Sequence, residues 1–168
     1  MNRTNRVEST YAFVSLVFVL ANFAGQNVFG QAPSFLLASN AWICFEQKQY
    51  AIAISNSLEC IKENEDEARA MQADMVKTNA VVPKGKVAPA IIDSIHANGI
   101  LNDVGTCHFI IGECESKLAS QGKSHIEEAR KAYTNAREFT YARCWDTNGW
   151  FWAPADKASL RLRKLPPP

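Results

Sequence analysis

Tryptophans are the side chains of this chain with the clearest capacity to hold a ligand, and three of the four lie close together near the C-terminus. Between residues 141 and 154 the sequence carries Tyr141, Trp145, Trp150, Phe151 and Trp152. Rings at this density can form a platform for a peptide or a glycan, or they can anchor a terminal helix by burying large areas. We predict Tyr141, Trp145, Trp150 and Trp152 as candidate partner-binding residues. We favour the anchoring role for the rings, with one exposed tryptophan able to do both.

The other reactive side chains form no catalytic or metal-binding pattern. His96, His108 and His125 fall on different predicted helices or turns, and none has a partner at metal-ligand spacing. The segment 122–124 (GKS) resembles the end of a phosphate-binding loop, but Lys117 stands where that loop needs its first glycine. We therefore predict no catalytic residue, no cofactor and no metal, and hence no enzyme.

Five cysteines leave at least one thiol unpaired. Cys107 lies near the start of one predicted helix and Cys144 just past the end of its antiparallel partner, so these two could approach. Cys107 and Cys114 are two turns apart on one helix, about 10 Å by helix rise, which is too far for a disulfide. Cys44, Cys60 and Cys114 are predicted to be buried as small apolar side chains. The sequence leaves open whether the Cys107–Cys144 bond forms.

Length and charge describe an ordinary globular chain. It has 168 residues, of which 47% are hydrophobic and 21% charged, and its formal net charge is +1. That length suits one domain, with or without a targeting segment. Nucleic-acid binding usually requires a basic stripe, so we predict no nucleic-acid partner.

The N-terminus has the pattern of a secretory signal peptide. Two arginines precede an apolar run over 11–24, which is shorter than the roughly 20 residues of a membrane-spanning helix. Val28 and Gly30 fit the small positions before a cleavage site, which places cleavage between Gly30 and Gln31. Residues 1–30 are thus predicted to be a signal peptide, and 31–168 the mature chain.

Removal of the signal peptide would take away two arginines and one glutamate, so the mature chain would be formally neutral. We expect the protein to be exported to the periplasm or the extracellular space. The alternatives are an uncleaved anchor helix and a buried core helix. Contact with a membrane is expected only through this segment, if it is not cleaved.

From residue 34 onward, apolar residues recur at helical spacing. The predicted helices cover 34–48, 50–61, 66–78, 89–98, 102–120, 124–139 and 154–165. The acidic cluster 63–67 is interpreted as a helix start, where carboxylates oppose the positive dipole end. Asn102 is interpreted as an N-cap, and 81–86 as a break that contains proline and glycine. No segment alternates with the period of a strand, so we predict an all-α fold of antiparallel helix pairs.

The string IEEARKAYTNA, residues 126–136, resembles the second helix of a tetratricopeptide repeat. Ala129, Tyr133 and Ala136 match its small, aromatic and small positions, and Gly112 resembles the small residue of the first helix. Ala41, Tyr50 and Ala53 match the pattern in the first helix pair. The resemblance implies a short right-handed superhelix in which small residues let helices approach closely. It divides the mature chain into a degenerate repeat (34–67), an irregular helical insert (68–101), the best-matching repeat (102–140), and an aromatic segment with a capping helix (141–168).

The segment TYARCW…GWFW resembles the C-terminal part of a group of exported bacterial tetratricopeptide-like proteins, some of which carry a β-glucanase precursor label. Glycoside hydrolysis requires a pair of positioned carboxylates, which the sequence does not present. The resemblance therefore implies a non-catalytic helical-repeat scaffold that binds a protein or peptide in the bacterial cell envelope. The alternative is a glycan-associated accessory protein or a β-glucanase-related hydrolase.

Overall fold

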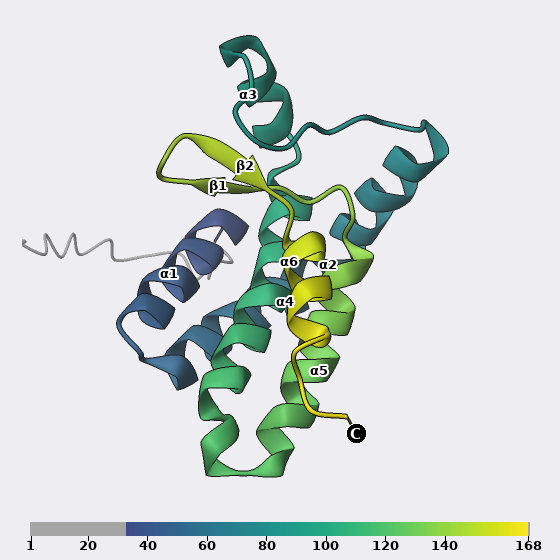
Figure 1. Cartoon of the computed structure of the whole chain (residues 1–168). Helices are drawn as coiled ribbons and strands as arrows, with labels where there is room; N and C mark the ends of the chain where they lie inside the picture. Colours follow the sequence, from purple (N-terminus) through teal and green to yellow (C-terminus); the bar gives the residue numbers. More distant parts are fainter. Residues whose placement is uncertain (1–32, 168) are drawn as a thin grey trace, which may run out of the picture. The chain divides into compact units, whose positions relative to one another are not determined.

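The computed structural model describes residues 33–167, so the predicted signal peptide and its cleavage site lie outside the described residues. The described chain is mostly helical, as predicted (Figure 1). Its elements are α1 (Ser34–Glu46), α2 (Tyr50–Lys77), α3 (Pro89–His96), α4 (Gly99–Leu118), the short 3₁₀ turn η1 (Ala119–Gln121), α5 (Lys123–Glu138), β1 (Cys144–Asp146), β2 (Trp150–Trp152) and α6 (Pro154–Leu162).

Helix α4 is the centre of the described unit. Its residues 104–114 are buried without interruption, and it packs against α1, α2, α5 and α6. A helix that is buried on all sides requires other elements around it, and here those four helices surround α4. The short connections 47–49 and 119–122 join α1 to α2 and α4 to α5, which gives two antiparallel helix pairs. The predicted helix pairing is therefore present.

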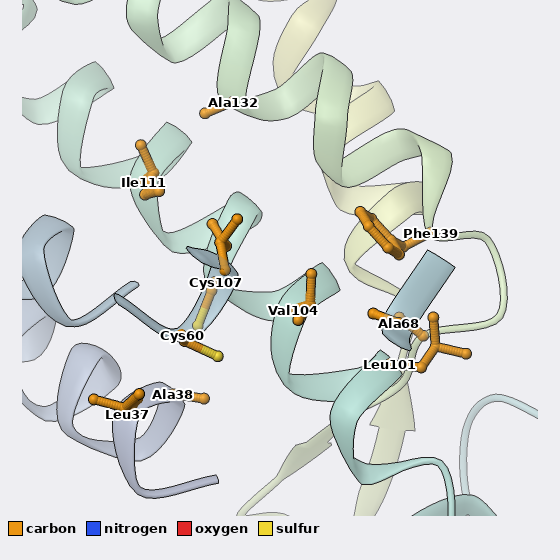
Figure 2. Close-up of a cluster of buried hydrophobic side chains, with 12 residues drawn as sticks. Leu37, Ala38, Cys60, Ala68, Leu101, Val104, Cys107, Ile111, Ala132 and Phe139 are labelled. Atoms are coloured by element: carbon orange, nitrogen blue, oxygen red, sulfur yellow. The ribbon is translucent and has the colours of Figure 1, made fainter. Parts of the chain in front are cut away.

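The largest core cluster lies where α1, α2, α4 and α5 meet (Figure 2). Leu37 of α1, Ala68 of α2 and Leu101 of α4 are each at most 5% exposed there. Phe139, directly after α5, closes the cluster and is 1% exposed. Because residues from both helix pairs contribute, this cluster joins the pairs to each other.

The predicted start of a new helix at the acidic cluster is wrong, because α2 runs without a break from Tyr50 to Lys77. Glycine and proline are absent from this stretch, so nothing in the backbone stops the helix. Carboxylates also fit the middle of a helix when cations lie one turn away, and Arg69 pairs with Glu65 at 2.7 Å. The boundary drawn between 67 and 68 therefore falls inside one helix.

The predicted N-cap role of Asn102 is also wrong. Helix α4 begins at Gly99, three residues earlier, and Asn102 lies inside it with 8% of its surface exposed. Its Nδ2 donates to the carbonyl of Ile95 at 2.8 Å, and its Oδ1 accepts from the backbone N–H of Arg143 at 2.7 Å. The amide thus joins the end of α3 to the segment before β1, and this long-range role has no signature in the local sequence.

The prediction of a chain without strands needs one correction. β1 and β2 form an antiparallel hairpin, in which Trp145 lies opposite Phe151. A turn between Asp146 and Gly149 connects the strands, with Gly149 at a φ of +87°. Each strand has only three residues, which is too short for an alternation that sequence analysis could detect.

The close helix crossing expected at Gly112 is confirmed. A Cβ atom on Gly112 would lie 2.5 Å from Cδ1 and Cε1 of Tyr133, so the ring of α5 lies directly on the backbone of α4. Ala129 and Ala136 of α5 are fully buried beside it. In the first pair the small residues are buried too, whereas Tyr50 is half-buried and contacts Phe45 with a centroid distance of 5.9 Å.

Helix α6 lies where the capping helix was predicted, and a buried ionic group fixes it. Glu113 of α4 is 9% exposed and accepts from Arg161 of α6 through both carboxylate oxygens, at 2.5 and 3.0 Å. The hydroxyl of Tyr133 donates to the same carboxylate at 2.7 Å. Burial raises the pKa of Tyr133, so the hydroxyl keeps its proton for this bond. One carboxylate therefore connects α4, α5 and α6.

All five cysteines are free thiols, so the considered Cys107–Cys144 disulfide is not present. Adjacent residues on a helix point about 100° apart, and Cys107 faces α2 whereas its neighbour Thr106 faces Cys144. The thiol of Cys107 contacts Cys60 instead (Figure 2). Cys60 and Cys114 are fully buried as predicted, and Cys44 is half-buried.

A buried histidine predicts how stability depends on pH. His108 is 5% exposed and stacks on Phe139 at 5.5 Å. Within residues 33–167 its Nε2 makes no hydrogen bond, although Oε1 of Glu65 lies 3.5 Å away. Burial lowers the pKa of His108, although Glu65 at 3.5 Å partly opposes this shift. The folded protein thus binds a proton on His108 less readily than the unfolded chain does. The contribution of neutral His108 to the free energy of unfolding is complete at pH values above its pKa in the unfolded chain, about 6.5. It is lost as the pH falls below that value.

We therefore expect the urea midpoint to fall between pH 7.5 and pH 5.5, and to fall less in His108→Gln. His96→Gln, which changes an exposed histidine, is the matched control. If both substitutions had the same effect on the pH dependence, the assignment to His108 would be wrong.

Candidate functional site

The hairpin divides the aromatic residues between two faces. Residues opposite each other in an antiparallel pair lie on the same face. Trp145 and Phe151 therefore share one face, with centroids 4.8 Å apart, while Trp150 and Trp152 lie on the other. Phe151 is 1% exposed, whereas Trp145 is 43% exposed and the other two tryptophans are half-buried. Trp145 is therefore the exposed tryptophan that the anchoring role allows, and Phe151 is the buried anchor.

Each face of the hairpin packs against a different helix. On the Phe151 face, the ring of His96 from α3 lies 5.5 Å from that of Phe151. On the other face, Trp152 contacts Trp42 of α1 at 6.2 Å and Phe109 of α4 at 5.3 Å. Tyr141, the remaining predicted binding residue, is half-buried and packs against the largest core cluster instead. The structure thus adds Trp42 to the site and separates Tyr141 from it.

A groove lies between α1 and the β1 strand, and we call it the α1–hairpin groove. It consists of an inner cavity of about 390 Å³ and an adjoining outer cavity of about 430 Å³. Both are lined by Ser39 and Trp42 of α1 and by Cys144 and Trp145 of β1. The inner cavity adds His96, Asp103, Thr106 and Arg143, and the outer cavity adds Glu46, Asp146 and Trp152.

Asp103 lines the inner cavity and has unused hydrogen-bonding capacity. Its Oδ2 accepts from the hydroxyl of Ser34 at 2.7 Å. Among residues 33–167, no basic side chain forms an ion pair with it. Burial raises the pKa of Asp103, and the bond from Ser34 partly opposes this shift. The carboxylate therefore lies at the wall of a cavity without a compensating charge.

Arg143 lines the same cavity, but its guanidinium is already hydrogen-bonded to the main chain. It is 7% exposed and donates to the carbonyls of Val82 and Pro83 and to those of Thr140 and Ala142. Burial lowers the pKa of Arg143. These bonds fasten the loop before α3 to the turn after α5, so Arg143 acts as a structural link beside the cavity.

Cys144 is the thiol of the groove. Its side chain contacts Thr106 and Trp42, and burial raises its pKa to about 11. The thiol is consequently protonated near neutral pH, whereas nucleophilic chemistry requires the thiolate. The chemistry that the groove offers is thus aromatic contact and hydrogen bonding.

The outer edge of β1 is open. Gly85 and Phe151 exchange two main-chain hydrogen bonds, of 2.7 and 2.9 Å, so the N–H and C=O of Phe151 point toward Gly85 and away from β1. Opposite residues alternate between bonded and non-bonded pairs in an antiparallel ladder, so Trp145 and Phe151 form a non-bonded pair. The N–H and C=O of Trp145 must then point outward, and within residues 33–167 only the weak Cys144 thiol donor reaches that carbonyl, at 3.8 Å.

Residues 33–167 contain no group of three or more histidine, cysteine or acidic side chains that could hold a metal ion. No helix in this range is both long and apolar enough to cross a membrane.

Comparison with known proteins gives no relative: no family model, no curated protein and no solved structure matches the chain.

Proposed function

We propose that the protein is a non-catalytic helical scaffold that binds an extended peptide segment of a protein partner in the α1–hairpin groove. The observation that carries the proposal is the open edge of β1, with the main-chain groups of Trp145 directed outward beside two cavities. An extended peptide can add to such an edge as a further strand, which supplies affinity through main-chain bonds and specificity through pockets for alternate side chains.

Aromatic rings around this edge support the same proposal. Trp145 keeps 43% of its surface exposed, and Trp42 lies on the opposite wall of the groove. Exposed tryptophans beside a concave surface are typical of the residues that dominate binding energy when a partner covers them. The rest of the hairpin is held firmly by Phe151, so the edge is presented on a fixed support.

The helical body fits a scaffold role of the tetratricopeptide type. The Gly112–Tyr133 crossing and the buried Ala129 support the best-matching tetratricopeptide-like repeat over 102–140, with α6 as its cap. We propose a short repeat-like arrangement of the helix pairs, and export of the mature chain to the cell envelope through residues 1–30.

A β-glucan is the alternative ligand, because an exposed ring such as that of Trp145 can also stack on a sugar. Main-chain hydrogen bonding distinguishes peptide binding from glycan binding. A peptide can use the outward N–H and C=O of Trp145 in strand geometry, whereas a glycan would contact the ring and leave the strand edge unpaired. The binding experiment therefore includes both ligand classes.

The first measurement is calorimetric titration of the mature chain with the blocked peptide Ac-Thr-Val-Thr-Lys-Thr-Val-Thr-NH₂ and with laminarihexaose. We expect the peptide to bind and Trp145→Ala to weaken binding about tenfold or more, which corresponds to about 1.4 kcal/mol. Trp150→Ala is the matched control, because this tryptophan is in the same hairpin but lines neither cavity of the groove. Binding of the glycan alone, or equal losses in the two variants, would contradict the proposal.

Main-chain pairing has its own test with N-methylated versions of the same peptide. Successive N–H groups of a strand point to opposite sides. N-methylation should therefore abolish binding at alternate positions and be tolerated at the positions between them. Uniform tolerance along the peptide would exclude strand addition at β1.

A further inference from the structure

An added strand would direct alternate side chains into the two cavities of the groove. The residue opposite Trp145 would lie on the same face of the sheet as Trp145 and Phe151, where the inner cavity lies. Its two neighbours would lie on the face of Cys144 and Trp152, where the outer cavity lies. The residue opposite Trp145 is therefore the one placed to enter the inner cavity.

Two of the polar side chains that line the inner cavity, those of Arg143 and Asn102, already have their donors bound to the protein. The donors of Arg143 are bound to four main-chain carbonyls, and the amide of Asn102 is bound on both sides. Asp103 uses one oxygen for Ser34 and has no cation among the described residues. A ligand group that enters here meets a carboxylate with open acceptor positions.

The walls of the inner cavity fit a long side chain with a cationic end. Trp42 of α1 and Trp145 of β1 line this cavity, and Phe35 adds a third ring that is 58% exposed. The methylene stem of lysine or arginine packs well against such rings, and a cation near an aromatic face gains further attraction. A volume of about 390 Å³ accommodates one such side chain.

Building on the proposed peptide-binding function, we infer that the inner cavity is a specificity pocket for a basic side chain, lysine or arginine, whose cationic end binds the Asp103 carboxylate between Trp42 and Trp145. The side chain comes from the residue that pairs with Trp145 along the β1 edge. Binding gives Asp103 the opposite charge that the described chain does not supply. It also places the carboxylate–cation pair where the protein partly shields it from screening by salt.

The test compares three blocked peptides that differ only at the central residue: lysine, norleucine and glutamate. Norleucine keeps the unbranched stem and removes the charge. We expect the lysine peptide to bind the parent protein about tenfold or more tightly than the norleucine peptide, and the glutamate peptide to bind weakest. In Asp103→Asn the ratio between lysine and norleucine should fall to near one, while the affinity for the norleucine peptide stays as in the parent.

Asparagine at position 103 can still accept the bond from Ser34, so the fold should be retained, and a thermal melt of the variant checks this. Glu46→Gln is the matched control, since it removes a carboxylate from the outer cavity. It should leave the lysine-to-norleucine ratio largely unchanged. An unchanged ratio in folded Asp103→Asn, or an equal fall in both variants, would overturn the assignment of the pocket to Asp103.

The outcomes separate this inference from the function on which it rests. If none of the three peptides binds the parent protein, peptide binding at the groove fails. If all three bind with equal affinity and Trp145→Ala weakens all of them, the groove binds peptides but the inner cavity does not select a basic residue.

Discussion

Phe151→Ala should lower the free energy of unfolding by about 3–5 kcal/mol, the range for loss of a fully buried phenylalanine. The ring is 1% exposed and contacts Trp145 at 4.8 Å and His96 at 5.5 Å. Its backbone also holds Gly85 through two hydrogen bonds. Removal of the ring would leave a cavity between the hairpin and α3. Urea unfolding followed by circular dichroism measures the change.

Trp150→Ala is the matched substitution, and its cost should be clearly smaller. Trp150 is half-buried on the opposite face of the same strand, so its removal leaves an open surface and no closed cavity. Similar midpoint shifts for the two variants would mean that the tryptophans and Phe151 share the anchoring, and would contradict the division of the hairpin into a buried and an open face. The same pair of proteins also provides a stability reference for the binding measurements.

Helices with a clear apolar stripe could be predicted from the sequence. The predicted helix over 124–139 corresponds to α5, and the predicted capping helix over 154–165 corresponds to α6. In both, the apolar stripe and the residues that end the helix lie in the same short segment of sequence. The full length of α2 could not be predicted in the same way. An acidic cluster suits the start of a helix and also its middle, and only the tertiary contacts of Ala68 and Arg69 show which applies here.

The anchoring residue of the hairpin could have been found from the sequence by a finer argument. Residues 146–149 (DTNG) are a strong turn signal, and aromatic residues flank them on both sides. A hairpin closed by this turn places Trp145 opposite Phe151, so one ring of the 150–152 triplet must face away from the other two. Because each strand has only three residues, the alternation is not visible as a periodic pattern, but it follows from the position of the turn.

The groove itself depends on contacts that no local pattern contains. Trp42 lies within the predicted helix over 34–48, and no local pattern marks it or Asp103 as a site residue. They meet Trp145 because α1, α4 and β1 converge in space, across more than 100 positions of sequence between the first and the last. Trp145 could be predicted from its chemical type alone, whereas the walls and the charge of the groove required the fold.

Gly112→Ala should cost about 3 kcal/mol of stability, at the upper end of the range for overpacking a core. The added Cβ would lie 2.5 Å from two ring carbons of Tyr133, and contacts this short require a shift of the ring or the backbone. The ring has little freedom to move, because its hydroxyl is bound to Glu113 at 2.7 Å and lies 3.1 Å from Ser116. The crossing of α4 and α5 would therefore have to open.

Gly99→Ala is the control on the same helix. A Cβ there has nothing within 4 Å, and alanine favours helix over glycine, so this variant should be as stable as the parent or slightly more so. The double variant Gly112→Ala with Tyr133→Leu completes a mutant cycle. If the clash lies between the new methyl group and the ring, the two substitutions should cost less together than the sum of their separate costs. Strict additivity would mean that Gly112 is required for another reason, and the close helix crossing would then no longer support a repeat-like packing of this pair.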